Sequence, residues 1–350
     1  MTQVISLFFI PPEILAQILD FVDECTIMLV ARLILVNKNA RTSISYTIPH
    51  IRMLNTMRDE ILDMFIGVRH LDIQNETFNL GTFNSRIWKN LESLTISTRI
   101  CQQLYKSEYL RSLLTDDKTD NLLTYFMPNL RCLEIYDQRF YEFVQINLKV
   151  FPSLKILKII NGNIENLNQF TSLERLEIYN PNVYESQRDR INNLNLRTLL
   201  ISESVDIVRH LHLDSLNISS LECLILRNLN ISLDDLKNLN INKLVLENVQ
   251  VEVLYKDLIM KHLKSLVLKK SRFGRLISHK LFPALTYLRM VGCKNIFAIP
   301  IGTSGKFEVI MEDCSTCLVV STMSRYDQSC LRMQRIISAR DSNHQTRLDN

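Results

Sequence analysis

The chain has 350 residues, of which 46% are hydrophobic and 22% charged, so it is long enough for one elongated domain or for two domains. Its formal net charge is only +4, with lysine and arginine spread along the chain, which argues against a nucleic-acid-binding surface. Seven glycines are few for an enzyme built on phosphate-binding loops, and the sequence lacks the GxGxxG, GxxxxGK[ST], HExxH and GxSxG motifs. The lack of these motifs predicts a non-catalytic protein without a cofactor. No apolar run is long enough to span a bilayer, so we expect no membrane contact.

Residues 10–48 predict two short helices. Pro11 and Pro12 suit the first turn of a helix, and the apolar residues that follow, Ile14, Leu15, Ile18, Leu19 and Val22, have helical spacing. A second helix is expected at about residues 26–40. Two short helices with this much aliphatic surface cannot hide it in each other. Either a partner covers it, or the helices cap the domain that follows.

The rest of the chain is dominated by one repeat: an apolar residue, two variable residues, leucine, one variable residue and a second apolar residue. Copies begin 19–25 residues apart, except for one interval of 39 that contains an insertion over residues 101–125. This period is typical of leucine-rich repeats. The copies start at Val68, Leu91, Leu130, Leu154, Leu173, Leu196, Leu221, Ile241, Leu263, Leu285 and, in a worn form, Lys306.

The spacing within each copy predicts a short strand. The last two apolar residues are two positions apart, so they point to the same face, and stacked copies can share one continuous core. A further apolar residue, such as Ile164, Ile231, Val251 or Phe273, follows ten residues after most starts and should return to that core. Asparagine or aspartate seven residues after a start predicts a turn in which the side chain bonds to backbone; these residues are Asn75, Asp137, Asn161, Asn180, Asn228 and Asn248.

Cysteine usage predicts an intracellular location. The eight cysteines show no paired framework, and several lie inside predicted strands, so we interpret them as reduced thiols in a cytoplasmic or nuclear protein. Cys314 and Cys317 form a lone CxxC pair, which lacks the further ligands that zinc needs. We interpret this pair as ordinary packing, and His210 and His212 as part of a loop between repeats rather than a metal site.

The opening segment resembles an F-box, in which Leu-Pro-x-Glu-Ile-Leu precedes an apolar helix and a Leu-Val-(Cys/Ser)-Lys-x-(Trp/Phe) stretch. Ile10-Pro11-Pro12-Glu13-Ile14-Leu15 matches the start and Leu35-Val36-Asn37-Lys38 the later stretch, although Ala40 stands near the usual aromatic residue. The resemblance implies a substrate receptor of a cullin-type ubiquitin ligase, which docks on a Skp-type linker subunit and itself does no chemistry. The residues implied in linker binding are Ile10, Pro11, Pro12, Ile14, Leu15, Ile18, Leu19, Leu35 and Val36.

A protein substrate would then bind the concave face of the repeats. Side chains two, four and six residues after each start should lie on this face, and the middle column presents four neighbouring apolar residues, a pattern typical of interaction sites. The column could equally be covered by the tail of the chain or reflect strand propensity alone. Carboxylates in these columns, such as Glu134 and Glu177, should be solvated on an open sheet, so we do not interpret them as an acid/base pair. The candidate substrate-binding residues are Tyr136, Arg175, Tyr179, Leu200, Ile225, Arg227, Lys243, Val245 and Val267.

Together these features predict an α/β fold in which a short helical F-box precedes a leucine-rich-repeat solenoid with a concave parallel sheet. The expected boundaries are an F-box over 1–48, a linker or capping helix over 49–67, repeats over 68–315, and a C-terminal cap with a disordered tail over 316–350. The function expected is that of the substrate-recognition subunit of an SCF-type ubiquitin ligase. The alternative is a leucine-rich-repeat scaffold that binds protein independently of ubiquitin.

Overall fold

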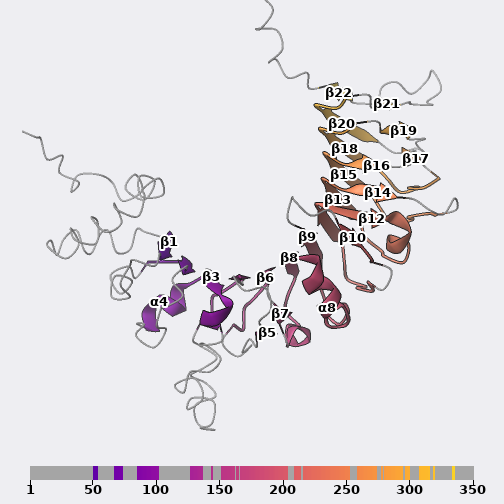
Figure 1. The fold of residues 1–350 in the computed structure, drawn as a ribbon. Helices are drawn as coiled ribbons and strands as arrows, with labels where there is room; N and C mark the ends of the chain where they lie inside the picture. Colours follow the sequence, from indigo (N-terminus) through magenta and orange to yellow (C-terminus); the bar gives the residue numbers. More distant parts are fainter. Residues whose placement is uncertain are drawn as a thin grey trace, which may run out of the picture. The chain divides into compact units, whose positions relative to one another are not determined.

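In the computed structural model, the chain consists of two units, residues 1–173 and 174–350 (Figure 1). Each unit is a stack of parallel strands. The described residues are 50–53, 67–73, 85–101, 127–136, 143–144, 151–161, 163–164, 166–203, 209–213, 216–252, 258–273, 277–278, 280–294, 296–299, 307–315, 318–319 and 333–335.

The long strands of the first unit lie side by side in chain order and are all parallel. Their register follows the repeat, because Leu71, Leu94, Leu133 and Leu157 are partners from strand to strand. All four leucines are buried, with exposed fractions of 2% or less. The strands are β1 (His50–Met53), β2 (His70–Ile73), β3 (Ser93–Ser97), β4 (Cys132–Tyr136) and β6 (Ile156–Ile160).

The second unit continues the same pattern with eight described long strands, again parallel and in chain order. From β8 to β18 a leucine stands at the second position of every strand and is partnered with its counterpart in the next repeat, as Leu224 is with Leu244, while Val309 takes this place in β20. The strands are β8 (Arg175–Tyr179), β9 (Thr198–Ser202), β11 (Cys223–Arg227), β13 (Lys243–Glu247), β15 (Ser265–Lys269), β18 (Tyr287–Val291), β20 (Glu308–Glu312) and β22 (Met333–Arg335).

Short strands form a second layer behind the long sheets. The apolar residues expected ten positions after a repeat start occupy these strands, and Ile164, Ile231, Val251 and Phe273 are all buried, as predicted. One group contains β10 (Arg209–Leu211), β12 (Leu229–Ser232), β14 (Gln250–Glu252) and β16 (Arg272–Phe273). Further pieces are β17 (Ile277–Ser278), β19 (Phe297–Ile299) and β21 (Leu318–Val319) in the second unit, and β5 (Phe143–Val144) and β7 (Asn163–Ile164) in the first.

Some repeats contain a helix, either after a short strand, as with η5 (Leu167–Gln169) and η6 (Leu233–Leu236), or in its place, as with α8 (Pro181–Asn192). The 12-residue helix α8 begins with proline, which suits the first turn because its missing N–H has no partner there anyway. Its residues Tyr184 and Ile191 are fully buried, so one side of α8 closes the core between β8 and β9. The shorter elements are α4 (Ser85–Asn90), which buries Trp88, and the 3-10 helices η5 and η6.

A column of left-handed turns follows the long strands. The residue directly after the strand has positive φ in six described repeats: Asn161 (63°), Asn228 (55°), Asn248 (52°), Lys270 (49°), Gly292 (61°) and Asp313 (50°). Asparagine and glycine adopt this region most readily. The predicted asparagine turn is confirmed at Asn228, whose Nδ2 donates to the carbonyl of Glu203 at 2.8 Å. Asn180 differs, because Pro181 follows it and begins α8.

The strand stack extends beyond residues 68–315 in both directions. Strand β1 lies within residues 49–67, where the sequence suggested a linker or capping helix, and it pairs in register with β2. A repeat copy does begin at Ile48, 20 residues before Val68, but isoleucine and methionine (Ile51 and Met53) replace its leucines. Strand β22 pairs with β20, with Met333 opposite Val309 and Arg335 opposite Met311, in a segment that the sequence analysis assigned to the C-terminal cap and tail.

The leucine-rich-repeat part of the fold prediction is therefore confirmed as a parallel β-solenoid. The helices predicted for residues 10–48 and the tail beyond residue 335 lie outside the described residues. Within the described part of the chain, no helix has the length and apolar character needed to cross a bilayer.

Candidate functional site

The candidate site lies on the outer face of β8–β20, which we define as the side chains at the first, third and fifth positions of these strands. Those at the second and fourth positions fill the core. In β11 and β13, for example, Leu224, Leu226, Leu244 and Leu246 are all 0% exposed. The alternation arises because successive residues of a strand point to opposite faces. The outer face is thus the surface that the sequence analysis expected a partner to use.

A central column of apolar residues runs across this face. Leu200, Ile225, Val245 and Val267 are direct partners in the strand register, so the predicted side-by-side arrangement is present. Their exposure is unequal. Leu200 is 1% exposed and Val267 8%, whereas Ile225 and Val245 are half-buried. The accessible apolar surface is therefore narrower than the sequence suggested and is centred on β11 and β13.

On β8, the predicted substrate-binding residues Arg175 and Tyr179 form a hydrogen-bonded cluster with Glu177, which the sequence analysis expected to be solvated. Glu177 is 4% exposed and accepts hydrogen bonds from Arg175 Nε at 2.6 Å and Tyr179 Oη at 2.8 Å. The expectation that Glu177 is solvated is therefore wrong, because its two neighbours on the same strand enclose it. Arg175 and Tyr179 are already bonded within the chain, which makes this end of the outer face preformed.

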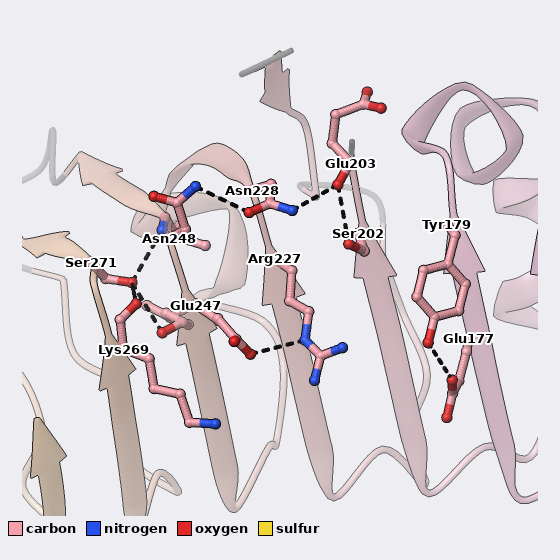
Figure 2. Close-up of polar contacts among 12 residues, drawn as sticks. Glu177, Tyr179, Ser202, Glu203, Arg227, Asn228, Glu247, Asn248, Lys269 and Ser271 are labelled. Atoms are coloured by element: carbon pink, nitrogen blue, oxygen red, sulfur yellow. Dashed lines mark hydrogen bonds and ion pairs between the residues drawn. The ribbon is translucent and has the colours of Figure 1, made fainter. Parts of the chain in front are cut away.

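A charged group lies along the fifth positions of β11, β13 and β15 (Figure 2). Arg227 Nε lies 3.0 Å from Glu247 Oε2, and both side chains are more than a third exposed. Lys269 is the next partner in register, and Figure 2 shows its side chain running across the same face with no contact drawn from its ammonium group. Arg227, a predicted substrate-binding residue, thus forms an ion pair at one side of the central column.

On the other side of the central column, Lys243 lies opposite Cys223 in the register of β11 and β13. Lys243 is exposed and Cys223 half-buried. Burial raises the pKa of the Cys223 thiol, while the positive charges of Lys243 and Arg175 oppose that rise. The thiol is therefore mostly protonated at neutral pH and does not have the lowered pKa of a reactive cysteine.

A second polar pair closes the face beyond the central column. Arg289 Nη2, on β18, donates to both carboxylate oxygens of Glu312, on β20, at 2.9 and 3.1 Å. With the Arg175–Glu177–Tyr179 cluster on β8, this pair brackets the central column along the strand order. The sequence alone could not predict the β8 cluster or the Arg289–Glu312 pair, because it does not show which of several nearby charged residues pair with each other.

Tyr136, the remaining predicted substrate residue, belongs to the first unit. Its hydroxyl donates to the carbonyl of Ile73 at 3.0 Å, across two strand spacings of β2, β3 and β4. It is not part of the group formed by the other eight residues. This hydrogen bond joins β4 to β2 within the first unit.

The described residues contain no group of three or more histidine, cysteine or acidic side chains that could hold a metal ion. The rings of His210 and His212 lie 4.8 Å apart on and just after β10, and both residues are exposed. The Cys314 thiol donates to the carbonyl of Glu312, while Cys317 is outside the described residues. All nine residues predicted to bind a linker subunit, from Ile10 to Val36, also lie outside them.

No protein-family model matches the sequence, and no curated protein is significantly similar to it. Among solved structures, an internalin (inlF) from Listeria monocytogenes shows 12% identity and a TM-score of 0.35, with coverage of 79% of this chain and 90% of the internalin. The TLR13–ssRNA13 complex also shows 12% identity and a TM-score of 0.35, with coverage of 81% of this chain and 54% of TLR13. Similarity this distant does not bear on what the chain binds.

Proposed function

We propose that the chain is a non-catalytic protein-binding scaffold that holds a protein partner on the outer face of β11–β15. We further propose that it serves as the substrate-recognition subunit of an SCF-type ubiquitin ligase. The first proposal rests on the geometry of the second unit. The second rests on the resemblance of residues 10–48 to an F-box.

The observation that carries the first proposal is the half-buried apolar pair Ile225 and Val245 on adjacent strands of the outer face, between the polar cluster of β8 and the Arg289–Glu312 pair. Protein interfaces commonly have an apolar centre within a polar rim whose hydrogen bonds are already satisfied. Here the cluster around Glu177 and the Arg289–Glu312 pair supply such a rim. A rigid parallel sheet also loses little conformational entropy on binding, which favours affinity.

A charge placed in the apolar centre tests this proposal. A protein captured by the full chain from a cell extract would be identified, purified and titrated against the wild type and the double variant Ile225→Asp, Val245→Asp. We expect Kd to rise by at least about tenfold, because two carboxylates would be buried without partners. The matched control Asn240→Asp, Asn242→Asp adds two charges at exposed positions just before β13. An unchanged Kd in the double variant, with its melting temperature maintained, would contradict the proposal.

The ubiquitin-ligase proposal would account for the apolar helix pair that the sequence predicts over residues 10–48. A partner helix surface could cover Ile14, Leu15, Ile18 and Leu19. The linker subunit and the cullin would then bring a ubiquitin-conjugating enzyme to the bound substrate, so that the reaction is promoted by effective concentration rather than by catalytic groups of this chain.

Binding to a purified Skp-type linker subunit separates the two functions. We expect the wild type to co-purify with the linker and the variant Ile14→Asp, Leu15→Asp to lose it. The control variant Ala16→Asp, Gln17→Asp adds the same two charges outside the predicted apolar stripe and should keep binding. If the wild type does not bind the linker, the ubiquitin-ligase proposal is wrong and the scaffold proposal stands alone.

A further inference from the structure

Two lysines on the outer face have no carboxylate partner among the residues that the structure describes. Lys243 is exposed on β13, and Lys269 is half-buried on β15. The three arginines of the same face differ, because each has an ion pair with a glutamate at 2.6–3.0 Å. Glu247, which faces Lys269 in register, is already engaged by Arg227. The centre of the outer face therefore carries two lysines that form no ion pair with any described residue.

The two lysines lie on opposite sides of the central apolar column. Lys243 occupies the first position of β13 and Lys269 the fifth position of β15, with Val245 and Val267 between them at the third positions. At about 3.3 Å per residue, four residues separate the two lysines by roughly 13 Å along the strands, and one strand spacing of about 4.8 Å separates them across the sheet. Cation, apolar surface and cation therefore follow one another in a line.

We propose, building on the protein-binding function above, that this face recognises a segment of the partner in which one apolar side chain lies between two carboxylates. The apolar side chain packs on Val245, whose neighbour Ile225 extends the apolar surface, and the carboxylates pair with Lys243 and Lys269. An extended segment fits this arrangement, because residues i, i+2 and i+4 project on the same side and i and i+4 are roughly 13 Å apart. The matching pattern is acid-x-apolar-x-acid.

Single-stranded nucleic acid is the other polyanion that two lysines could attract. Such ligands are usually held by a continuous basic groove and by aromatic side chains on which bases stack. Here the column between the lysines is aliphatic, and Glu247 and Glu177 lie on the same face. An acidic protein segment therefore agrees better with both the charge and the apolar surface.

A set of matched peptides tests the proposal with the full-length chain. Peptides with a central leucine and glutamate, glutamine or lysine at both flanking positions are immobilised at high density, and binding is followed by surface plasmon resonance. We expect retention to be about five- to tenfold stronger on the glutamate peptide than on the glutamine peptide, the size expected for two exposed ion pairs. The difference should fall with added salt, because the Debye length shortens from about 10 Å at 0.1 M to about 3 Å at 1 M.

Charge reversal gives the decisive comparison. The variant Lys243→Glu, Lys269→Glu should prefer the lysine peptide, while the control Lys237→Glu, Lys261→Glu, with the same change in net charge at exposed positions outside the outer face, should keep the wild-type order. The proposal is overturned if the glutamine peptide binds as well as the glutamate peptide, if reversal leaves the order unchanged, if no peptide is retained, or if immobilised oligouridylate is retained more strongly. In each of these cases the effect of Ile225→Asp, Val245→Asp on the partner captured from extract still decides the protein-binding function separately.

Discussion

Ser271 and Cys293 hold the same place in successive repeats and contact equivalent carbonyl groups. Ser271 Oγ lies 2.9 Å from the carbonyl oxygen of Lys269 and 3.0 Å from that of Leu246, which are 2 and 25 residues earlier. Cys293 Sγ lies 3.5 Å from the carbonyl oxygen of Val291 and 3.4 Å from that of Leu268, at the same two separations. Both residues are buried. At these two turns, the side chain that follows the left-handed residue therefore joins its own strand to the preceding one.

Replacing Ser271 tests how much this contact stabilises the stack. Ser271→Ala removes the acceptor of the Val249 N–H, which lies 3.1 Å from Oγ in a buried site. We expect the free energy of unfolding to fall by about 1–3 kcal/mol, the usual cost of an unsatisfied buried donor. Urea denaturation measures it. Ser271→Cys should lose less, because cysteine occupies the equivalent position at 293. Equal stability of Ser271→Ala and the wild type would contradict this role.

Gly292 is the place where a side chain should be least tolerated in the turn column. Its φ is +61°, and an added Cβ would lie 3.3 Å from Cγ of Lys270. Gly292→Ala should therefore lower the free energy of unfolding by about 1–2 kcal/mol, the cost of the left-handed conformation for a residue with a Cβ. Gly292→Asn should lose less, since asparagine occupies the same place at Asn228 and Asn248. If the two variants unfold at the same urea concentration, the conformational explanation is wrong.

The enclosed carboxylate of Glu177 should be coupled to Tyr179. A double-mutant cycle between Glu177→Ala and Tyr179→Phe, followed by urea denaturation, should give an interaction energy of about 0.5–1.5 kcal/mol. The comparison pair is Glu134 and Lys158, whose side chains are 27% and 32% exposed and 3.4 Å apart. That pair should give less, because solvent screens it. A smaller coupling for Glu177 than for Glu134 would contradict the closed arrangement of the β8 cluster.

Cys101 should resist alkylation in the folded protein. Burial raises the pKa of its thiol to about 12, so the thiolate, which is the reactive form, is scarce at every pH below that value. Treatment with iodoacetamide at pH 8.5, followed by mass spectrometry, should modify the half-buried Cys314 well before Cys101. The same treatment in urea should modify both. Rapid labelling of Cys101 in the native protein would show that its site opens to solvent.

The repeat pattern predicted most of the fold because one spacing determines both the strand and its register. Once leucines recur at the same place, the partner of Leu224 must be Leu244, and the outer columns follow. The pattern did not predict elements in which residues other than the repeat leucines fill the core. Ile51 and Met53 concealed β1, and α8 was missed although Tyr184 and Ile191 lie at helical spacing.

The candidate site was less predictable because it depends on which neighbours combine. The sequence placed Ile225 and Val245 together, yet it could not show that Leu200 is covered while they stay accessible. It also treated Glu177 as a solvated acid, although Arg175 and Tyr179 enclose it. These outcomes depend on side-chain conformations rather than on spacing. The structure also showed that Glu247 pairs with Arg227, which leaves Lys269 without an ion pair among the described residues.

The backbone hydrogen bonds of the left-handed turns have a consequence for how the number of repeats can change. The N–H groups of Asn228, Asn248, Lys270 and Gly292 each donate to the last residue of the following strand, at 2.7–3.0 Å. At these four joints, each coil is thus bonded to its successor by the same geometry, whichever residue stands at the joint. The gain or loss of one whole repeat would leave the other joints unchanged. The outer face could therefore lengthen or shorten by one repeat at a time, through duplication or deletion of a repeat.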